Sequence, residues 1–257
     1  MMKLAALQMQ AVAGDQAANL ARIDRAARDA AIAGADLLVV PELALPGYGA
    51  GAAMAALAEP ADGPLVDSLA VIARAAGVAI VAGFAERVGA DVYNSAVFID
   101  GRGDYVVYRK SHLYGPYEKG LFRPEPPRTR LFDVAGMKLG MLICYDVEFP
   151  ENVRRLARAG AQAVIVPTAL PAGPSGNFIA AHMIPVRAFE NQVFVAYINH
   201  CGADARFSYA GLSRIAAPDG SILAEAGATG EALLIADLDM GAYAASAEVN
   251  TYLRDLG

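Results

Sequence analysis

The chain has 257 residues, 56% hydrophobic and 19% charged, which is enough apolar material for a large core and excludes the disordered class. Its net charge is −6 and its basic residues are scattered, so we expect no nucleic-acid partner and no anionic-membrane surface. No window approaches the roughly eighteen apolar residues of a transmembrane helix. The apolar start is too short for a signal peptide and instead predicts a strand.

The numbers and positions of the cysteines and histidines argue against a disulfide-stabilised protein and against a zinc protein. The two cysteines, Cys144 and Cys201, do not make a disulfide framework, so we expect a reducing, cytoplasmic setting. The three histidines, His112, His182 and His200, share no metal-ligand spacing, and with two unclustered cysteines they argue against a zinc site.

Helices and strands alternate along the first half of the chain. Asp15 is a helix cap followed by apolar residues at helical spacing, and Gly34 supplies the stop. Residues 111–124, rich in aromatics and glycines, predict an ordered lid or pocket wall. The expected strands are 3–9, 36–40, 78–84, 93–100 and 105–108, and the expected helices are 15–33, 64–76 and a short one within 50–62.

The second half repeats the alternation. Pro185 lies inside an expected helix and predicts a kink there. The tail from Met240 onward shows no clear pattern. The expected strands are 131–134, 138–143, 163–166, 193–199, 213–217, 221–226 and 233–238, and the expected helices are 150–160 and 177–191.

This interleaving, without a linker or a charge run, predicts one layered α/β domain over residues 1–257. We expect two sheets packed face to face with helices outside each. Periodicity alone does not distinguish that architecture from an open, doubly wound sheet.

Three chemically distinct side chains each follow an apolar strand: Glu42, Lys110 and Cys144. The carboxyl ends of strands form the edge of an α/β sheet where ligands bind. There a thiol could act as nucleophile, a carboxylate could take the thiol proton and later activate water, and an ammonium could stabilise the oxyanion. The simpler interpretations are a buried core cysteine and two solvated charges.

At these residues the chain resembles the carbon–nitrogen hydrolase, or nitrilase, superfamily. Val40-Pro41-Glu42-Leu43 is similar to its glutamate motif, residues 108–113 (YRKSHL) to its lysine motif, and residues 142–146 (LICYD) to its cysteine motif, which Phe149-Pro150-Glu151 continues. The intervals of 68 residues from Glu42 to Lys110 and 34 from Lys110 to Cys144 are also family-like. The resemblance spans residues 3–238.

The resemblance implies an αββα sandwich that pairs as a homodimer or larger homo-oligomer, with a thioester acyl-enzyme and no metal or organic cofactor. It implies that Cys144 is the nucleophile, Glu42 the general base, and Lys110 the group that stabilises the intermediate. Glu118 matches a second glutamate, found in many members, that positions the substrate and assists the base, although it could be an ordinary loop charge. The backbone N–H of Tyr145 would complete the oxyanion site.

Within the superfamily, the motifs look most like those of bacterial short-chain amidases. Typical nitrilases follow their cysteine with Trp-Glu and carry a longer tail, whereas this chain has Tyr145-Asp146. Omega-amidases commonly have an arginine where this chain has Glu148, which would repel a substrate carboxylate if it faced the pocket. We therefore expect hydrolysis of a small neutral or cationic amide, with nitrilase, N-carbamoyl hydrolase and omega-amidase as alternatives.

The sequence also offers candidate substrate-binding residues and two alternative functions. Tyr48, Tyr145 and the segment from Thr168 to Leu170 are candidate substrate-binding residues, and Tyr48 and the segment could equally be packing residues. A Cys201–His200 dyad is a weaker candidate, because the three motifs place the nucleophile elsewhere. A non-catalytic member would usually lose one of the three motif residues, and an acyltransferase would pass the same thioester to a nucleophile other than water.

Overall fold

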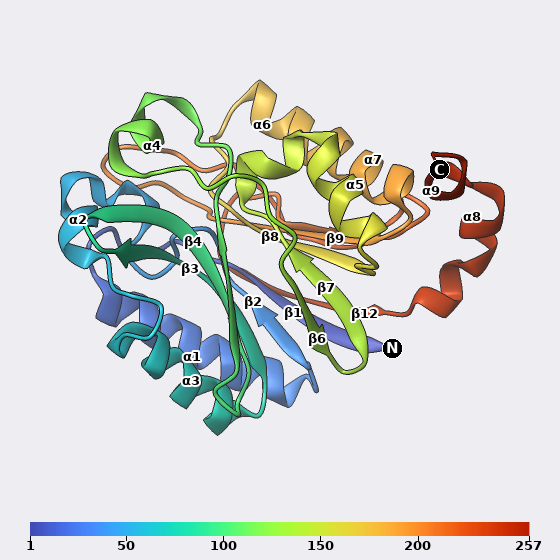
Figure 1. Ribbon diagram of the computed structural model, residues 1–257. Coiled ribbons are helices and arrows are strands. Elements are labelled where there is room, and N and C mark those ends of the chain that lie inside the picture. The colour runs from blue at the N-terminus through green and yellow to red at the C-terminus, as the bar shows by residue number, and fades with distance from the viewer. Residues whose placement is uncertain (257) are drawn as a thin grey trace.

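The computed structural model describes residues 1–256, and in it two six-stranded sheets pack face to face between outer helices (Figure 1). Gly257, the last residue of the predicted domain, lies outside the described residues. The first sheet has the order β12-β1-β2-β3-β4-β5 and the second β11-β10-β9-β8-β7-β6. The strands are β1 Met2–Gln8, β2 Leu37–Val39, β3 Ala79–Val88, β4 Asp91–Ile99, β5 Tyr105–Arg109, β6 Leu131–Val134, β7 Met137–Met141, β8 Ala163–Thr168, β9 Phe194–Asn199, β10 Arg214–Ala216, β11 Ile222–Glu225 and β12 Ala232–Leu238.

Each sheet has three parallel strands at its centre and antiparallel strands outside them. In the first sheet β1, β2 and β3 run parallel, and in the second β7, β8 and β9 do so. Strands β4, β5 and β12 add to the first sheet antiparallel, as β6, β10 and β11 do to the second. Parallel strands bring their carboxyl ends to one edge, so the segments after β2, β7 and β8 are available for a common site.

Amphipathic helices cover the outer face of each sheet (Figure 1). Helices α1 (Gln16–Ile32) and α3 (Pro64–Ala76) lie on the first sheet, and α5 (Pro150–Arg158) and α7 (Ile184–Asn191) lie on the second. Ile23 of α1 and Leu69 of α3, both fully buried, belong to one apolar cluster with the strand residues Leu38 and Ile80. The predicted cap is present, since the Asp15 carboxylate accepts a hydrogen bond from Ala18 N at 2.9 Å.

A second core fills the space between the sheets. Phe98 of β4 and Phe132 of β6 stack across it, with ring centroids 4.1 Å apart and planes at 22°. Leu4 of the first sheet and Ile165 of the second are fully buried in the same cluster. The predicted four-layer αββα sandwich is therefore confirmed, and the open, doubly wound sheet is excluded.

Two segments differ from the expectation. The expected lid contains a short helix, α4 (Gly115–Leu121), which begins with Pro116 in its first turn. The expected helix over residues 177–191 is built from α6 (Pro174–Phe178), a π-helical turn (Ile179–Met183) and α7. Pro185 lies in the first turn of α7, and because it has no N–H to donate, the change of helix type occurs just before it.

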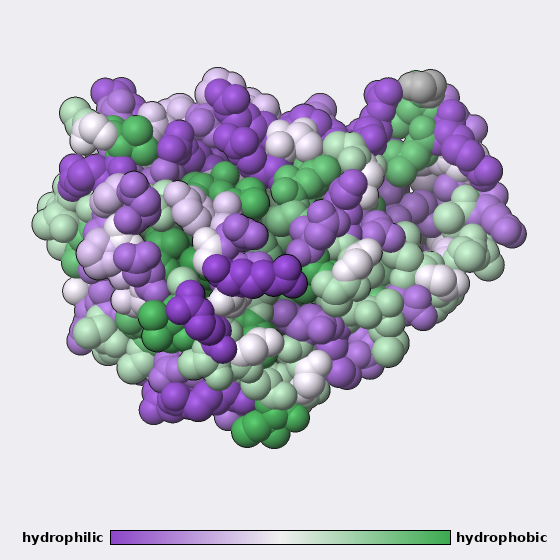
Figure 2. Space-filling model, turned by 60° about the horizontal axis from the view of Figure 1, so that its bottom comes forward, coloured by the Kyte–Doolittle hydropathy of each residue, from purple (hydrophilic) through white to green (hydrophobic). Residues whose placement is uncertain are grey.

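The remaining short elements are α2 (Met54–Leu57) and the C-terminal α8 (Ala244–Val249) and α9 (Tyr252–Asp255), with 3₁₀ turns at Tyr48–Ala53, Cys144–Glu148 and Met240–Tyr243. Helices α8 and α9 project from one side of the body, where Tyr252 contacts Phe189 of α7 (Figure 1). On the face in Figure 2, hydrophilic and hydrophobic residues are intermixed. None of the helices among residues 1–256 is both long and apolar enough to cross a bilayer.

Candidate active site

Cys144 lies at a strained turn directly after β7. Ile143 is extended, but Cys144 has φ 44°, a left-handed conformation that is uncommon for a residue with a side chain. The turn begins the 3₁₀ segment that leads into α5, and it places the thiol at the wall of a cavity of about 470 Å³. Cys144 itself is 6% exposed, so the turn presents a rigid, nearly buried thiol to that cavity.

Lys110 bridges two carboxylates beside this thiol. Glu42 follows β2, Lys110 follows β5, and Glu118 lies on α4. The ammonium Nζ donates to Glu42 Oε1 at 2.6 Å and to Glu118 Oε1 at 2.7 Å. All three side chains are fully buried. The structure therefore brings together the ionisable residues that the sequence selected, Glu118 included.

Neutral donors complete the carboxylate contacts and leave one oxygen free. Asn94 Nδ2 donates to Glu42 Oε1 at 2.7 Å, and Tyr48 OH donates to Glu118 Oε1 at 2.8 Å. The backbone N–H of Tyr114 donates to Glu118 Oε2 at 2.8 Å. Glu42 Oε2 is buried and accepts no hydrogen bond from any described residue. That oxygen is therefore free to accept a further hydrogen bond.

Burial and charge set the protonation states of the site. Burial raises the pKa of Glu42 to about 7, an effect that the Lys110 charge opposes and the Glu118 charge supports. Burial likewise raises the pKa of the Cys144 thiol well above its usual range. Burial would lower the pKa of Lys110, but Glu118, Glu42 and Cys144 outweigh it and the pKa is raised. The resting site thus holds an ammonium and a protonated thiol beside a carboxyl group that titrates near neutrality.

The segment after β8 contributes a backbone donor. The backbone N–H of Ala169 lowers the pKa of the Cys144 thiol, and so works against the larger rise that burial causes. Thr168 lines neither of the cavities beside Cys144. It is fully buried, and its hydroxyl donates to the carbonyl of Val166 at 3.0 Å, because it is still part of β8 and faces the core. Of the predicted segment, Leu170 lines the cavity.

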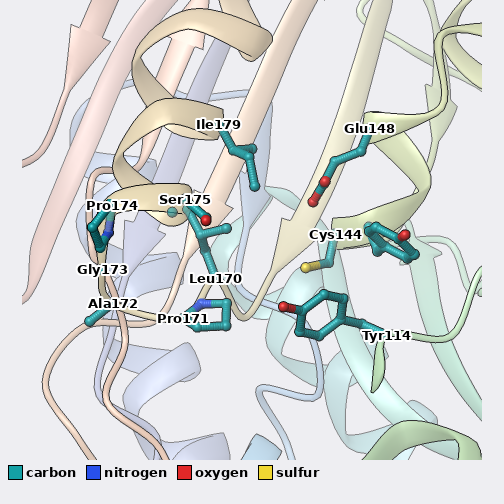
Figure 3. A pocket seen from close by; sticks show the side chains of 12 residues that line it. Tyr114, Cys144, Glu148, Leu170, Pro171, Ala172, Gly173, Pro174, Ser175 and Ile179 are labelled. Atoms are coloured by element: carbon teal, nitrogen blue, oxygen red, sulfur yellow. The ribbon is translucent and has the colours of Figure 1, made fainter. Parts of the chain in front are cut away.

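The cavity beside the thiol is mostly apolar (Figure 3). Tyr145, a predicted substrate-binding residue, lines it, and Glu148 is its one charged lining residue. Tyr48, also predicted, instead lines an adjoining aromatic cavity of about 220 Å³ that shares Tyr114 and Pro171 with the first. The larger cavity is also lined by Leu170, Ala172, Gly173, Pro174, Ser175, Gly176 and Ile179.

Three residues support the site in roles that were not predicted from the sequence. Asn94 holds Glu42, as described above. Asp146 accepts hydrogen bonds from Tyr108 OH and from the backbone N–H of His112, both at 2.8 Å. These bonds connect the cysteine turn (Cys144–Glu148) to the residues on either side of Lys110. His200 Nε2 donates to the carbonyl of Glu42 at 2.7 Å. For Asn94 the only available signal was a polar residue within an apolar strand.

Among residues 1–256, no group of three or more His, Cys, Asp or Glu side chains is placed to hold a metal ion. The proposed Cys201–His200 dyad has little geometric support, because His200 faces the backbone of Glu42 and both cysteines are buried. The ionisable groups that do converge are those around Lys110.

Comparison with known proteins agrees with this geometry. Residues 3–248 match the carbon–nitrogen hydrolase family. The chain is 47% identical over 246 residues to a "Hydrolase in pqqF 5'region" of Pseudomonas protegens (94% of this chain, 84% of that protein) and 38% identical over 257 residues to an (R)-stereoselective amidase of Pseudomonas sp. (99% and 91%). It also resembles a cysteine-to-alanine mutant of the amidase from Nesterenkonia sp. AN1 in complex with butyramide, with a TM-score of 0.88 and 35% identity over 99% of this chain and 93% of that one. The chain therefore belongs to the carbon–nitrogen hydrolase family, and it is an enzyme that hydrolyses carbon–nitrogen bonds.

Proposed function

We propose that the protein is a cysteine-dependent amidase that converts a small carboxylic amide to its acid and ammonia through a thioester. The observation that carries this proposal is the contact of Lys110 with both Glu42 and Glu118 beside the Cys144 cavity. The butyramide complex of the similar Nesterenkonia amidase supports a short aliphatic amide as the substrate.

Acylation begins with transfer of the thiol proton to Glu42, through the free oxygen Oε2. The Cys144 thiolate then attacks the amide carbonyl carbon, and the carbonyl electrons move to oxygen. That oxyanion receives the third N–H of Lys110 Nζ, whose other two are used by the glutamates, and the backbone N–H of Tyr145. When the carbonyl re-forms, the C–N bond breaks and Glu42 returns its proton to the departing ammonia.

Deacylation uses the same groups, with water in place of the thiol as the nucleophile and the thiolate in place of ammonia as the leaving group. Glu42, again a carboxylate, takes a proton from water as the water oxygen attacks the thioester carbonyl. The carbon–sulfur bond then breaks, the acid leaves, and the thiolate takes the proton back. The oxygens of Glu118 are already occupied by Lys110, Tyr48 and the Tyr114 N–H. Glu118 therefore holds Lys110 in place, and it positions the substrate through that ammonium.

Ammonia release tests the proposal. We expect the wild type to release ammonia from propionamide and butyramide, and Cys144→Ala to release none while remaining folded. Propionitrile, an N-carbamoyl amine and glutaramate test for a nitrilase, a carbamoyl hydrolase and an omega-amidase. Faster hydrolysis of one of these than of every amide would overturn the assignment. Hydroxamate formed from hydroxylamine much faster than acid would indicate an acyltransferase.

We further propose that the enzyme is a homodimer or larger homo-oligomer in the cytoplasm. The helices near the site carry exposed apolar side chains, Phe178 on α6 and Val186 on α7, which a partner copy would cover. Both cysteines are free, and the thiol that the mechanism needs is preserved in a reducing compartment. Light scattering of the wild type and of Phe178→Asp tests the association, because a monomeric wild type would contradict it.

A further inference from the structure

We propose that Glu148 makes the Cys144 cavity selective for amides whose acyl chain carries a positive charge, with the substrate ammonium paired to the Glu148 carboxylate. This inference rests on the proposed amidase function and names the substrate class of the same site.

Glu148 and the nucleophile stand on one short, rigid segment. Both belong to the 3₁₀ turn Cys144–Glu148, and Figure 3 shows the Cys144 sulfur and the Glu148 carboxylate directed into the same space, with Ile179 beside it. Arg187 fixes the end of this turn by donating to the carbonyls of Val147 and Glu148, at 2.9 and 2.7 Å. A substrate held at Cys144 therefore has the carboxylate at a fixed place along its acyl chain.

The carboxylate has no partner of its own. Among residues 1–256 no donor hydrogen-bonds to it, and no basic group lies within ion-pair distance. The Arg187 guanidinium donates to the two backbone carbonyls, and its Nη1 donates to Glu190 Oε1 at 3.0 Å. Burial raises the pKa of Glu148, and the charges of Lys110 and Arg187 oppose that rise. A partly desolvated carboxylate without a donor costs folding free energy, and a bound ammonium would offset that cost.

The rest of the site does not cancel this charge. The other lining residues of the cavity, among them Tyr114, Leu170 and Ile179, are uncharged. Two cations lie nearby. Arg187 is held by two backbone carbonyls and Glu190. Lys110 is shared by two carboxylates, so with these groups ionised the catalytic cluster is itself negative. An acyl chain with a carboxylate would be repelled, an alkyl chain would gain nothing from Glu148, and an ammonium would be attracted. The reaction is unchanged, because the charged group takes no part in breaking the C–N bond.

A matched set of substrates separates these cases. 5-Aminopentanamide and hexanamide have chains of the same length and differ in an ammonium or a methyl group at the end, and glutaramate presents a carboxylate. For the wild type we expect kcat/KM to be about tenfold higher for the amino amide than for hexanamide, mainly through KM, and lowest for glutaramate. The shorter pair, 4-aminobutanamide and pentanamide, establishes which chain length reaches the carboxylate.

Two variants assign the preference to Glu148. Glu148→Gln keeps the shape and removes the charge, so the ratio of the two kcat/KM values should fall to about one. Glu151→Gln neutralises an exposed carboxylate three residues further on and should leave the ratio at its wild-type value. An equal rate for amine and alkyl substrates in the wild type, or an unchanged ratio in Glu148→Gln, overturns the inference.

A binding measurement is independent of turnover. With Cys144→Ala, 5-aminopentanamide should raise the melting temperature more than hexanamide does, and the difference should vanish in Cys144→Ala/Glu148→Gln. Equal shifts for the two amides in Cys144→Ala would also overturn the inference. If neither the alkyl amides nor the amino amides were hydrolysed by the wild type, the proposed amidase function would fail, whereas hydrolysis without charge preference would reject only the role of Glu148.

Discussion

At the scale of single residues, the proposed mechanism depends on the ionisation state of Glu42. Burial raises its pKa to about 7, and only the ionised form can take the thiol proton. We therefore expect kcat/KM for butyramide to rise with pH through about 7, since a larger fraction of Glu42 is ionised there. Butyramide does not titrate, so the rising limb reports the free enzyme. A rate that is flat from pH 5.5 to 8.5 would contradict Glu42 as the base.

Asn94 tunes that carboxyl group without touching the thiol. Its Nδ2 donates to Glu42 Oε1 at 2.7 Å, and this hydrogen bond stabilises the ionised form and lowers the pKa. In Asn94→Ala we expect the rising limb of the kcat/KM profile to move to higher pH, with a lower rate at neutral pH. A merely structural role would lower the whole profile without moving its midpoint. The pH profile therefore distinguishes the two.

The residues that the sequence could predict share one property. Each has a charged or reactive side chain directly after an apolar strand, within one of three family motifs that follow one another along the chain. Glu42, Lys110 and Cys144 met that description, and the structure brings them together. Thr168 is indeed the last residue of β8, but its side chain is buried and its hydroxyl donates to the carbonyl of Val166. Asn94 could not be found in this way, because a polar residue on a strand looks the same whether it faces solvent or a buried carboxylate.

At the scale of elements, the turn that holds Glu42 rests directly on β3. The N–H of Gly83 donates to the carbonyl of Pro41 at 3.3 Å, and Leu43 just beyond has φ 48°. A Cβ at Gly83 would lie 2.2 Å from the backbone N of Leu43 and 2.7 Å from Glu42 Cα. Glycine at position 83 thus allows the closest approach between strand and turn.

Gly83→Ala should therefore displace the turn that carries Glu42. We expect a loss of about 1–3 kcal/mol in the free energy of unfolding, the usual range for overpacking, together with a large fall in kcat. Gly120→Ala is the matched control, because a Cβ there meets nothing within 4 Å and the backbone is helical. Denaturant unfolding and butyramide kinetics on both variants provide the check. A fully active Gly83→Ala would show that the turn does not depend on this contact.

Helix α4 shows why some elements could not be predicted from sequence. Residues 115–121 contain two glycines and a proline, which ordinarily indicate a loop. Tertiary contacts stabilise the helix instead: Glu118 is held by Lys110 and Tyr48, and Tyr117 donates to the carbonyl of Tyr48 at 2.6 Å. The buried ion pair thus fixes both the helix and the site, and local propensity contains no information about it.

At the scale of the whole molecule, the site is shared between the two sheets. Glu42 and Lys110 follow strands of the first sheet, and Cys144 and Ala169 follow strands of the second. Hydrogen bonds join the halves at this edge: Tyr108 of β5 contacts Asp146 in the cysteine turn, and His200 after β9 contacts the backbone of Glu42. Neither sheet could form the site alone, so activity should depend on packing far from the thiol.

The Phe98–Phe132 stack offers a test of that dependence, because it joins the sheets across the inter-sheet core. We expect Phe132→Ala to lower the free energy of unfolding by about 3–5 kcal/mol, the usual cost of removing a buried aromatic ring. If residues 1–257 form one domain, helix content by far-UV circular dichroism, tyrosine signals in the near-UV and amidase activity should be lost in one coincident transition. Val71→Ala, at a side chain 62% exposed on α3, should change stability by no more than about 0.5 kcal/mol. Separate transitions would mean that the sheets unfold independently, and the shared site would then be lost when the less stable sheet unfolds.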